Sequence, residues 1–201
     1  MSVSATAGTV GRIGPNAIIR VGEVLQRRLG AATAARLYAA AGLSGYYAEP
    51  PSAMVDEAEA RRLHVQLRSA LGDRLAAEVS REAGIATADY LLAHRIPKPV
   101  QALLRVLPAP LASRVLLKAI ARHAWTFAGS GRFEVVAGRP VRLTIRDNPL
   151  CRGQASDHPV CDYYAATFEQ LFRVLVHPAT RVTETHCEAR GDDACRFELR
   201  W

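Results

Sequence analysis

The residues with the clearest chemical potential are the four cysteines, and all of them lie within residues 151–201: Cys151, Cys161, Cys187 and Cys195. Cys187 and Cys195 flank a predicted turn, so antiparallel pairing of the flanking strands would bring their thiols together. Thiolates are soft ligands that select zinc. The spacing is too wide for a zinc knuckle, so two interpretations stay open, a tetrahedral metal site and four free buried cysteines.

A second chemical feature is positive charge concentrated in one stretch. The net charge is +7, and residues 1–123 contain all of it, with 16 basic and 9 acidic side chains. No acid occurs between Asp89 and Glu134, where seven basic residues lie. Such a field attracts anions: nucleic acid, acidic lipid headgroups or a ligand with carboxylates. The stretch lacks interleaved aromatic residues, which argues against nucleic acid. A solvated basic face is the plain alternative.

Helical periodicity dominates residues 15–123, with breaks that divide it into several helices. Pro15 is suited to open the first helix and Gly30 to end it, and a second helix ends at Gly42. Residues 43–52 are expected to be a loop, and Asp56 opens a long helical stretch that resumes after residue 72. Prolines at 97, 99, 108 and 110 cut the following stretch into two amphipathic, basic helices.

From about residue 124 the period of the apolar residues changes to two, which predicts strands. Alternation over 133–135 and 141–145 predicts a hairpin, and 181–188 and 194–201 predict two more strands joined by a turn at 190–193. Between the pairs lies one long helix, expected to begin near Asp157 and Pro159. The fold class is therefore α+β, with a helical region 1–123 and an antiparallel sheet plus one long helix in 124–201.

Composition limits the class of protein. The chain has 201 residues, of which 49% are hydrophobic and 22% charged, as in folded globular proteins and unlike disordered ones. No apolar run approaches the roughly 20 residues of a membrane helix, and MSVSATAGTVGRIGP lacks the apolar core of a signal peptide. We therefore expect a cytoplasmic protein, in which cysteines bind metal or stay free rather than form disulfides.

Several motifs resemble the 4-vinyl reductase domain family. They are Val160-Cys161-Asp162-Tyr163-Tyr164, Glu184-Thr185-His186-Cys187 and Gly191-Asp192-Asp193-Ala194-Cys195-Arg196-Phe197. Residues 11–17 (GRIGPNA) and 125–131 (WTFAGSG) are similar to the members of this family that act in bacteriochlorophyll biosynthesis. The resemblance covers most of the chain and is densest over 125–201.

The resemblance implies a fold similar to the Bet3-like vesicle-tethering proteins and to the sensor domains of phenol-responsive regulators. In those sensors three cysteines and a glutamate hold a structural zinc ion. Transferred to this sequence, the ligands are Cys161, Glu184, Cys187 and Cys195, with Cys151 outside the set and a four-cysteine site as the competitor. Glu184 and Cys187 would face opposite sides of a regular strand, so a bulge between them is predicted.

The family name implies reduction of a vinyl group on a chlorophyll precursor, yet the sequence contains no recognisable redox motif. It has no G-x-G-x-x-G between a strand and a helix and no closely spaced cysteines for an iron–sulfur cluster. Catalysis therefore stays undecided. We favour a protein that binds a Mg-tetrapyrrole intermediate and delivers it to Mg-chelatase or a later pathway enzyme. A vinyl reductase of divinyl protochlorophyllide and a small-molecule-sensing or assembly module are the alternatives.

A tetrapyrrole would require an aromatic cleft with basic groups at its mouth. The candidate residues are Tyr46, Tyr47, Trp125 and Phe127 for the macrocycle, and Arg95, Arg114, Lys118 and Arg122 for its propionates. Aromatic residues that simply build the core are the competing interpretation. The basic helices could instead contact the photosynthetic membrane peripherally. Relatives further imply a homodimer through the helical half.

Overall fold

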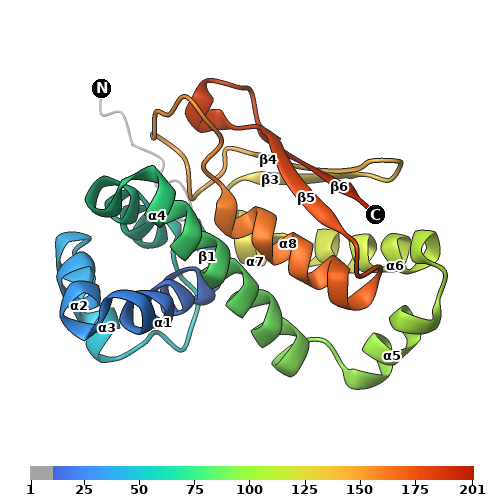
Figure 1. Cartoon of the computed structure of the whole chain (residues 1–201), viewed down its shortest axis with the longest axis horizontal. Coiled ribbons are helices and arrows are strands. Elements are labelled where there is room, and N and C mark those ends of the chain that lie inside the picture. Colours follow the sequence, from blue (N-terminus) through green and yellow to red (C-terminus); the bar gives the residue numbers. More distant parts are fainter. Residues whose placement is uncertain (1–10) are drawn as a thin grey trace, which may run out of the picture.

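The computed structural model describes residues 11–201 and combines a helical half with a four-stranded antiparallel sheet (Figure 1). Residues 1–10, on which most of the expectation about a signal peptide rests, lie outside the described residues. The predicted α+β class is confirmed. None of the helices within residues 11–201 has the length and apolar character needed to cross a lipid bilayer.

Four helices form the N-terminal half: α1 Asn16–Leu29, α2 Ala31–Ala40, α3 Ser44–Ala48 and α4 Glu57–His94. Gly30, with φ at 82°, separates α1 from α2, as the sequence predicts. The short α3 lies within 43–52, so the expectation of an unbroken loop there is wrong. Asp56 caps α4 by accepting a hydrogen bond from Ala58 N, and Gly72 (φ 72°) kinks this long helix.

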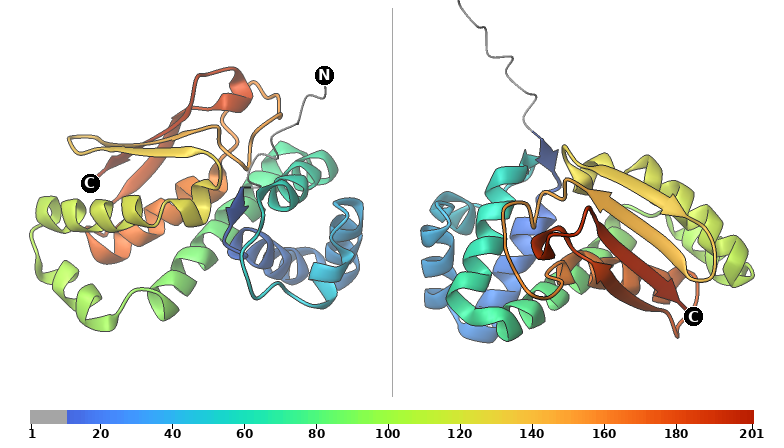
Figure 2. Two further views of the ribbon diagram at one scale, coloured as in Figure 1. Left: turned by 180° about the vertical axis from the view of Figure 1, so that it is seen from behind. Right: turned by 90° about the horizontal axis from the view of Figure 1, so that it is seen from above.

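Two proline-initiated helices and one helical turn lead into the sheet: α5 Lys98–Val106, α6 Ala109–Arg122 and α7 Trp125–Ala128. Pro97 and Pro108 immediately precede α5 and α6, which confirms the predicted division of this segment. The view from behind shows α5 and α6 as a hairpin at the far end of the molecule from α2 (Figure 2). A small pair of strands, β1 Arg12–Ile13 and β2 Val55–Asp56, joins the start of the chain to the start of α4.

The main sheet has the strand order β3-β4-β6-β5, and every neighbouring pair is antiparallel. Its strands are β3 Arg132–Val136, β4 Val141–Arg146, β5 Arg181–His186 and β6 Cys195–Arg200. Leu143 of β4 pairs with Phe197 of β6, and both are fully buried on the inner face. The other face is polar, with ion pairs such as Arg142–Glu198. This alternation is the pattern that the sequence predicts.

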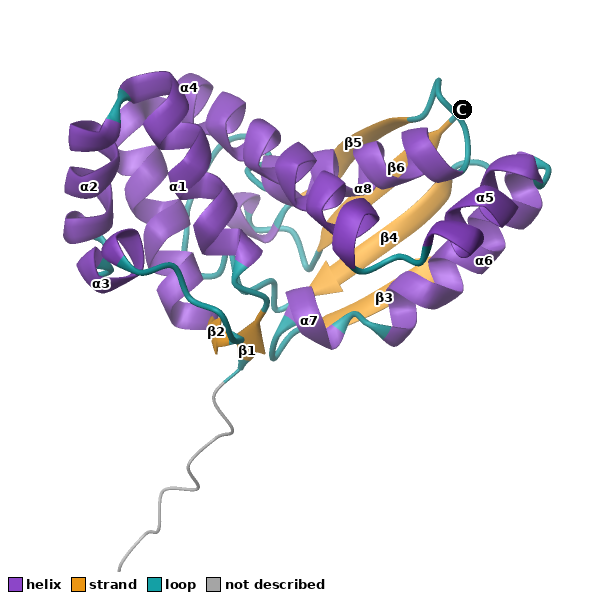
Figure 3. Ribbon diagram, turned by 90° about the horizontal axis from the view of Figure 1, so that it is seen from below, coloured by secondary structure: helices purple, strands orange, loops and turns teal. Residues whose placement is uncertain are grey.

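The long helix α8 Asp162–Leu175 covers the inner face of the sheet (Figure 3). The expectation that it begins near Asp157 and Pro159 is wrong, because residues 147–161 form a loop and Cys161 occupies the cap position. The Cys161 N–H donates to the Glu184 carboxylate at 2.8 Å, which satisfies one of the free amides at the helix start. The loop therefore serves to deliver cysteines rather than to extend the helix.

Helix α4 crosses α8 on the side away from the sheet and contacts it closely. A Cβ atom on Gly84 would lie 2.3 Å from Tyr163 O, so only glycine allows this approach. Two hydroxyl groups link the two helices at the crossing: Thr167 Oγ1 donates to Gly84 O at 3.1 Å, and Thr87 Oγ1 lies 2.8 Å from Tyr163 Oη. The helical half and the sheet therefore share one continuous core.

The buried carboxylate of Glu57 forms a second junction between the two halves. Its oxygens accept from Ser130 N at 2.7 Å, from Ser130 Oγ and from Arg152 Nη1 at 3.0 Å. A Cβ atom on Gly11 or Gly129 would overlap this carboxylate, which explains the glycines in the two conspicuous motifs. Burial raises the pKa of Glu57, but the bonds from Ser130 and Arg152 outweigh it, so the pKa lies below its ordinary value.

Replacing Glu57→Gln should lower the free energy of unfolding by about 1.5–3 kcal/mol at neutral pH, because hydrogen bonds to a charged group are lost. The lowered pKa means that this contribution exists above the ordinary carboxyl range and is lost as the pH falls through the folded-state value. Urea unfolding of variant and wild type should therefore converge in acid. The exposed Glu49→Gln is the matched control. Equal stability of Glu57→Gln and wild type at neutral pH would contradict this role.

Candidate metal centre

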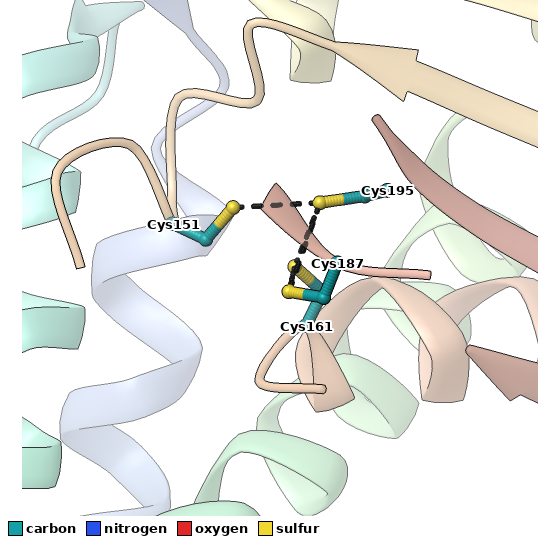
Figure 4. Close-up of side chains that lie close together, drawn as sticks. All are labelled: Cys151, Cys161, Cys187 and Cys195. Atoms are coloured by element: carbon teal, nitrogen blue, oxygen red, sulfur yellow. Dashed lines mark hydrogen bonds between the residues drawn. The ribbon is translucent and has the colours of Figure 1, made fainter. Parts of the chain in front are cut away.

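All four cysteines meet at one end of the sheet, although they come from three segments of the chain (Figure 4). Cys151 and Cys161 belong to the loop between β4 and α8. Cys187 directly follows β5, and Cys195 begins β6. Figure 4 shows the sulfur atoms pointing toward a common space. The turn between Cys187 and Cys195 brings these two together, as the sequence predicts.

The distances between the sulfur atoms fit a single tetrahedral ion. Cys195 Sγ lies 3.4 Å from Cys151 Sγ and 3.6 Å from Cys161 Sγ, and Cys187 Sγ lies 3.9 Å from both Cys161 and Cys195. All four atoms lie within 4.8 Å of one another. With Zn–S bonds of about 2.3 Å, the edges of a tetrahedron are about 3.8 Å. All four cysteines are free thiols.

Burial makes this cluster electrostatically demanding. All four cysteines are buried, and burial raises the pKa of Cys161 well above that of a free thiol. Hydrogen bonds from the Cys151, Cys161 and Cys195 thiols lower the pKa of Cys187. One thiolate is thus favoured by its neighbours, while further ionisation is opposed by burial and like charge. A bound cation removes this opposition, because a coordinating thiol is deprotonated outright.

Polar groups surround the sulfur atoms and orient them. The buried Asn148 donates from Nδ2 to Cys161 Sγ at 3.2 Å, and Glu188 N lies 3.5 Å from Cys195 Sγ. Asp192 accepts a hydrogen bond from Cys187 N at 2.8 Å, which holds the turn. Donors of this kind position ligands and tune a metal site.

Sequence reasoning missed the roles of Asn148 and Glu188. The sequence predicts Asn148 only as part of the strand-ending segment Asp147-Asn148-Pro149. A polar residue at the end of a buried strand is a weak signal in sequence alone, because only the folded loop brings it to the sulfur of Cys161. Glu188 accepts from Asn148 N at 2.8 Å and so closes the same loop against the turn.

Glu184, predicted as a metal ligand, borders the cluster. Its Oε2 accepts from Cys161 N, whereas its buried Oε1 has no hydrogen-bond partner among the described residues. Burial, together with the nearby Cys187 and Cys195, raises the pKa of Glu184 to about 10. The predicted bulge is confirmed, because the pairing of β5 with β6 shifts register between Glu184 and His186. The carboxyl group and the thiol of Cys187 therefore lie on the same side.

The structure separates the aromatic residues that were predicted to contact a tetrapyrrole. Tyr46 and Tyr47 lie on α3, where their hydroxyl groups donate to Glu59 and to Ala31 O. Phe127 packs beneath the sheet in an aromatic cluster with Phe133, Tyr164 and Phe168. The side chain of Trp125 is exposed on α7. These four side chains do not line one cavity.

The basic residues predicted to meet the propionates are also far from the tyrosines. Arg95 follows α4, and Arg114, Lys118 and Arg122 lie on the exposed side of α6, at the opposite end of the molecule from α3 (Figure 1). A surface groove of about 540 Å³ lies elsewhere, between α2, the first half of α4 and the loop after Cys151. The residues lining it are Ala40, Ala41, Arg61, Arg62, Val65, Gln66, Arg152 and Gly153.

Known proteins similar to this chain share both its sequence and its fold. The family model of the 4-vinyl reductase domain matches residues 141–201, the part that contains the cysteine cluster. The bacteriochlorophyll synthase 23 kDa chain of Cereibacter sphaeroides is 50% identical over 94% of this chain and 90% of its own length. The protein of the same description from Rhodobacter capsulatus is 45% identical over 94% of this chain and 86% of its own length.

Solved structures with a similar fold are H-NOX proteins. One, described as probing heme distortion in the H-NOX family, has a TM-score of 0.58 and 12% identity over 93% of this chain and 94% of its own. A mutant H-NOX protein from K. algicida has a TM-score of 0.60 and 9% identity over 94% of this chain and 96% of its own. These likenesses concern the fold alone. With half of its residues shared over almost the whole length of both chains, the protein belongs to the 4-vinyl reductase domain family that contains the bacteriochlorophyll synthase 23 kDa chains.

Proposed function

We propose that this protein serves bacteriochlorophyll synthesis by binding a Mg-tetrapyrrole intermediate and delivering it to a pathway enzyme, with a structural zinc ion in the cysteine cluster. The observation that carries the proposal is the 50% identity to a bacteriochlorophyll synthase 23 kDa chain over nearly the full length of both proteins. The H-NOX likeness supports it at the level of fold, because that family is described with a heme and a fold of this kind can therefore hold a flat macrocycle.

A binding role fits the metal centre better than catalysis does. Four sulfur ligands close a tetrahedral site, which leaves the ion no position for a substrate. Such a site stabilises the fold around it, and in this protein it would fix the loop after β4 against the turn between β5 and β6. The chemistry of pigment delivery then falls to a separate surface.

The groove beside α4 is the candidate surface for the pigment. Its volume of about 540 Å³ lies in the range of ligand sites, and its lining combines apolar Ala40, Ala41 and Val65 with arginines. Arg152 is bound to Glu57, and Arg62 donates to Ala41 O. Arg61, in contrast, makes no ion pair among the described residues, so its guanidinium is free to bind a propionate.

The identity of the fourth metal ligand separates two versions of the zinc site. The sulfur distances favour Cys151 beside Cys161, Cys187 and Cys195. The unpartnered buried Oε1 favours Glu184, the ligand that the family resemblance implies. We propose Cys151, because its sulfur already lies within the tetrahedral spacing of Cys195.

Purified protein should contain one zinc ion per chain, and Cys151→Ser should weaken zinc binding more than Glu184→Gln does. The serine variant loses a ligand, so its loss should exceed the roughly 10–100-fold typical of outer hydrogen-bonding partners. Elemental analysis and competition with chelators of graded strength measure both. The reverse order of the two variants would make Glu184 the fourth ligand, and zinc-free wild type would end the metal proposal.

A Mg-porphyrin with two free propionates should bind the protein, and Arg61→Gln should reduce its affinity roughly 10- to 100-fold, the value of one charge-assisted contact. The diester of the same porphyrin should bind weakly to both proteins. Absorption and fluorescence titrations give the affinities.

The exposed Arg36→Gln on α2 is the matched control, since it removes one charge outside the groove. The sequence-based alternative predicts the loss in the combined variant Arg114→Gln, Lys118→Gln, Arg122→Gln. A loss there without one in Arg61→Gln would move the propionate contact to α6. No binding of any Mg-porphyrin by the metal-loaded protein would contradict the carrier proposal.

A further inference from the structure

We propose that the hairpin of α5 and α6 docks on an anionic lipid surface, with its outer aliphatic side chains entering the bilayer interface and its basic side chains contacting the headgroups. This hairpin, residues 97–122, lies at one end of the molecule (Figures 1 and 2). The inference is independent of the pigment site, which lies along α2 and α4.

The outer surface of the hairpin is unusually apolar. Large hydrophobic side chains that remain exposed among the described residues gather here, with Val106 at 79% and Leu103 at 54% exposure. The exposed aliphatic residues of the hairpin are Val100, Leu103, Val106, Leu111 and Val115. Single exposed aliphatic residues are ordinary, but a contiguous group of this kind marks an interaction surface.

Folding of the hairpin does not require these exposed side chains, because its inner face is already packed. Leu104 of α5 and Leu116 and Leu117 of α6 are buried against the body. The buried Gln101 donates from Nε2 to Ile96 O at 2.8 Å, which fixes the start of α5. The outer aliphatic face is thus additional to the core that the helices need for stability.

Uncompensated positive charge surrounds this apolar face. Its basic residues are Arg95, Lys98, Arg105, Arg114, Lys118 and Arg122, and none of them forms an ion pair within residues 11–201. Elsewhere arginines are commonly paired, as Arg28 is with Glu78 and Arg146 with Asp193. With no acid between Asp89 and Glu134, the field over the hairpin has one sign.

Trp125 extends the surface beyond the end of α6. Its side chain is 61% exposed, although tryptophan usually finds cover in a folded protein. Tryptophan is enriched at the boundary between lipid and water, where its ring sits among the headgroups. An aromatic anchor, aliphatic side chains and basic residues on one surface are the components of interfacial membrane binding.

A bilayer fits this surface better than a protein partner does. The energetic centres of protein interfaces are mainly Trp, Tyr and Arg in fitted pockets, while leucine and valine are under-represented there. The hairpin presents mostly short aliphatic side chains and a single sign of charge. An anionic bilayer supplies both the apolar layer and the opposite charge, without any requirement for a matching shape.

Sedimentation with vesicles tests the proposal, using the metal-loaded full-length protein without pigment. The protein should bind vesicles of phosphatidylcholine and phosphatidylglycerol in equal parts, and bind phosphatidylcholine vesicles much more weakly. Removing three charges with Arg114→Gln, Lys118→Gln and Arg122→Gln should weaken binding about 100-fold, and added salt should act in the same direction.

A matched variant, Arg27→Gln, Arg36→Gln and Arg74→Gln, removes equal charge from exposed positions outside the hairpin. It should keep most of the vesicle affinity. An apolar variant, Leu103→Ser with Val106→Ser, should also lose binding. Thermal unfolding identifies any variant that has lost its fold.

Fluorescence gives a second readout that needs no variant of the hairpin. In Trp201→Phe, Trp125 is the remaining tryptophan, and its emission should shift to shorter wavelength on anionic vesicles. Failure of the wild type to bind anionic vesicles would overturn the proposal. Equal losses in the two charge variants would overturn it as well, since they would indicate attraction by net charge alone.

Discussion

Four buried thiols within one small volume impose the constraint on which the C-terminal half depends. Their sulfur atoms all lie within 4.8 Å, without a disulfide, and burial opposes the ionisation of more than one of them. A divalent cation resolves this by holding all four as thiolates. The register shift in β5, the turn before Cys195 and the loop from residue 147 to Cys161 are then parts of one ligand cage.

The helical half is joined to this cage by two contacts of different kinds. Gly84 lets α4 approach α8 closely, and α8 begins immediately after Cys161. The Glu57 carboxylate binds Arg152, the neighbour of Cys151. Packing and electrostatics therefore both connect α4 to the loop that presents the first two cysteines. The groove on α4 shares Arg152, so the pigment surface and the metal cage have a common boundary.

Local patterns predicted much of the fold, because alternation and helical periodicity report which face of an element is buried. The strands around Leu143 and Phe197 and the divided helices after Pro97 follow from such patterns. Three of the clustered cysteines also follow, since a turn and one helix bring them together. The position of Cys151 could not be derived, because it depends on the conformation of a long loop. The scattered aromatic residues show that residue type does not reveal a shared cavity.

X-ray absorption at the zinc edge of the purified protein tests the central claim most directly, because it reports which atoms bind the metal. The account predicts a zinc signal with four sulfur neighbours at about 2.3 Å and no lighter ligand. A shell of three sulfurs with one oxygen would contradict the four-cysteine cage. Protein that carries no metal, yet keeps its fold, would contradict the constraint itself.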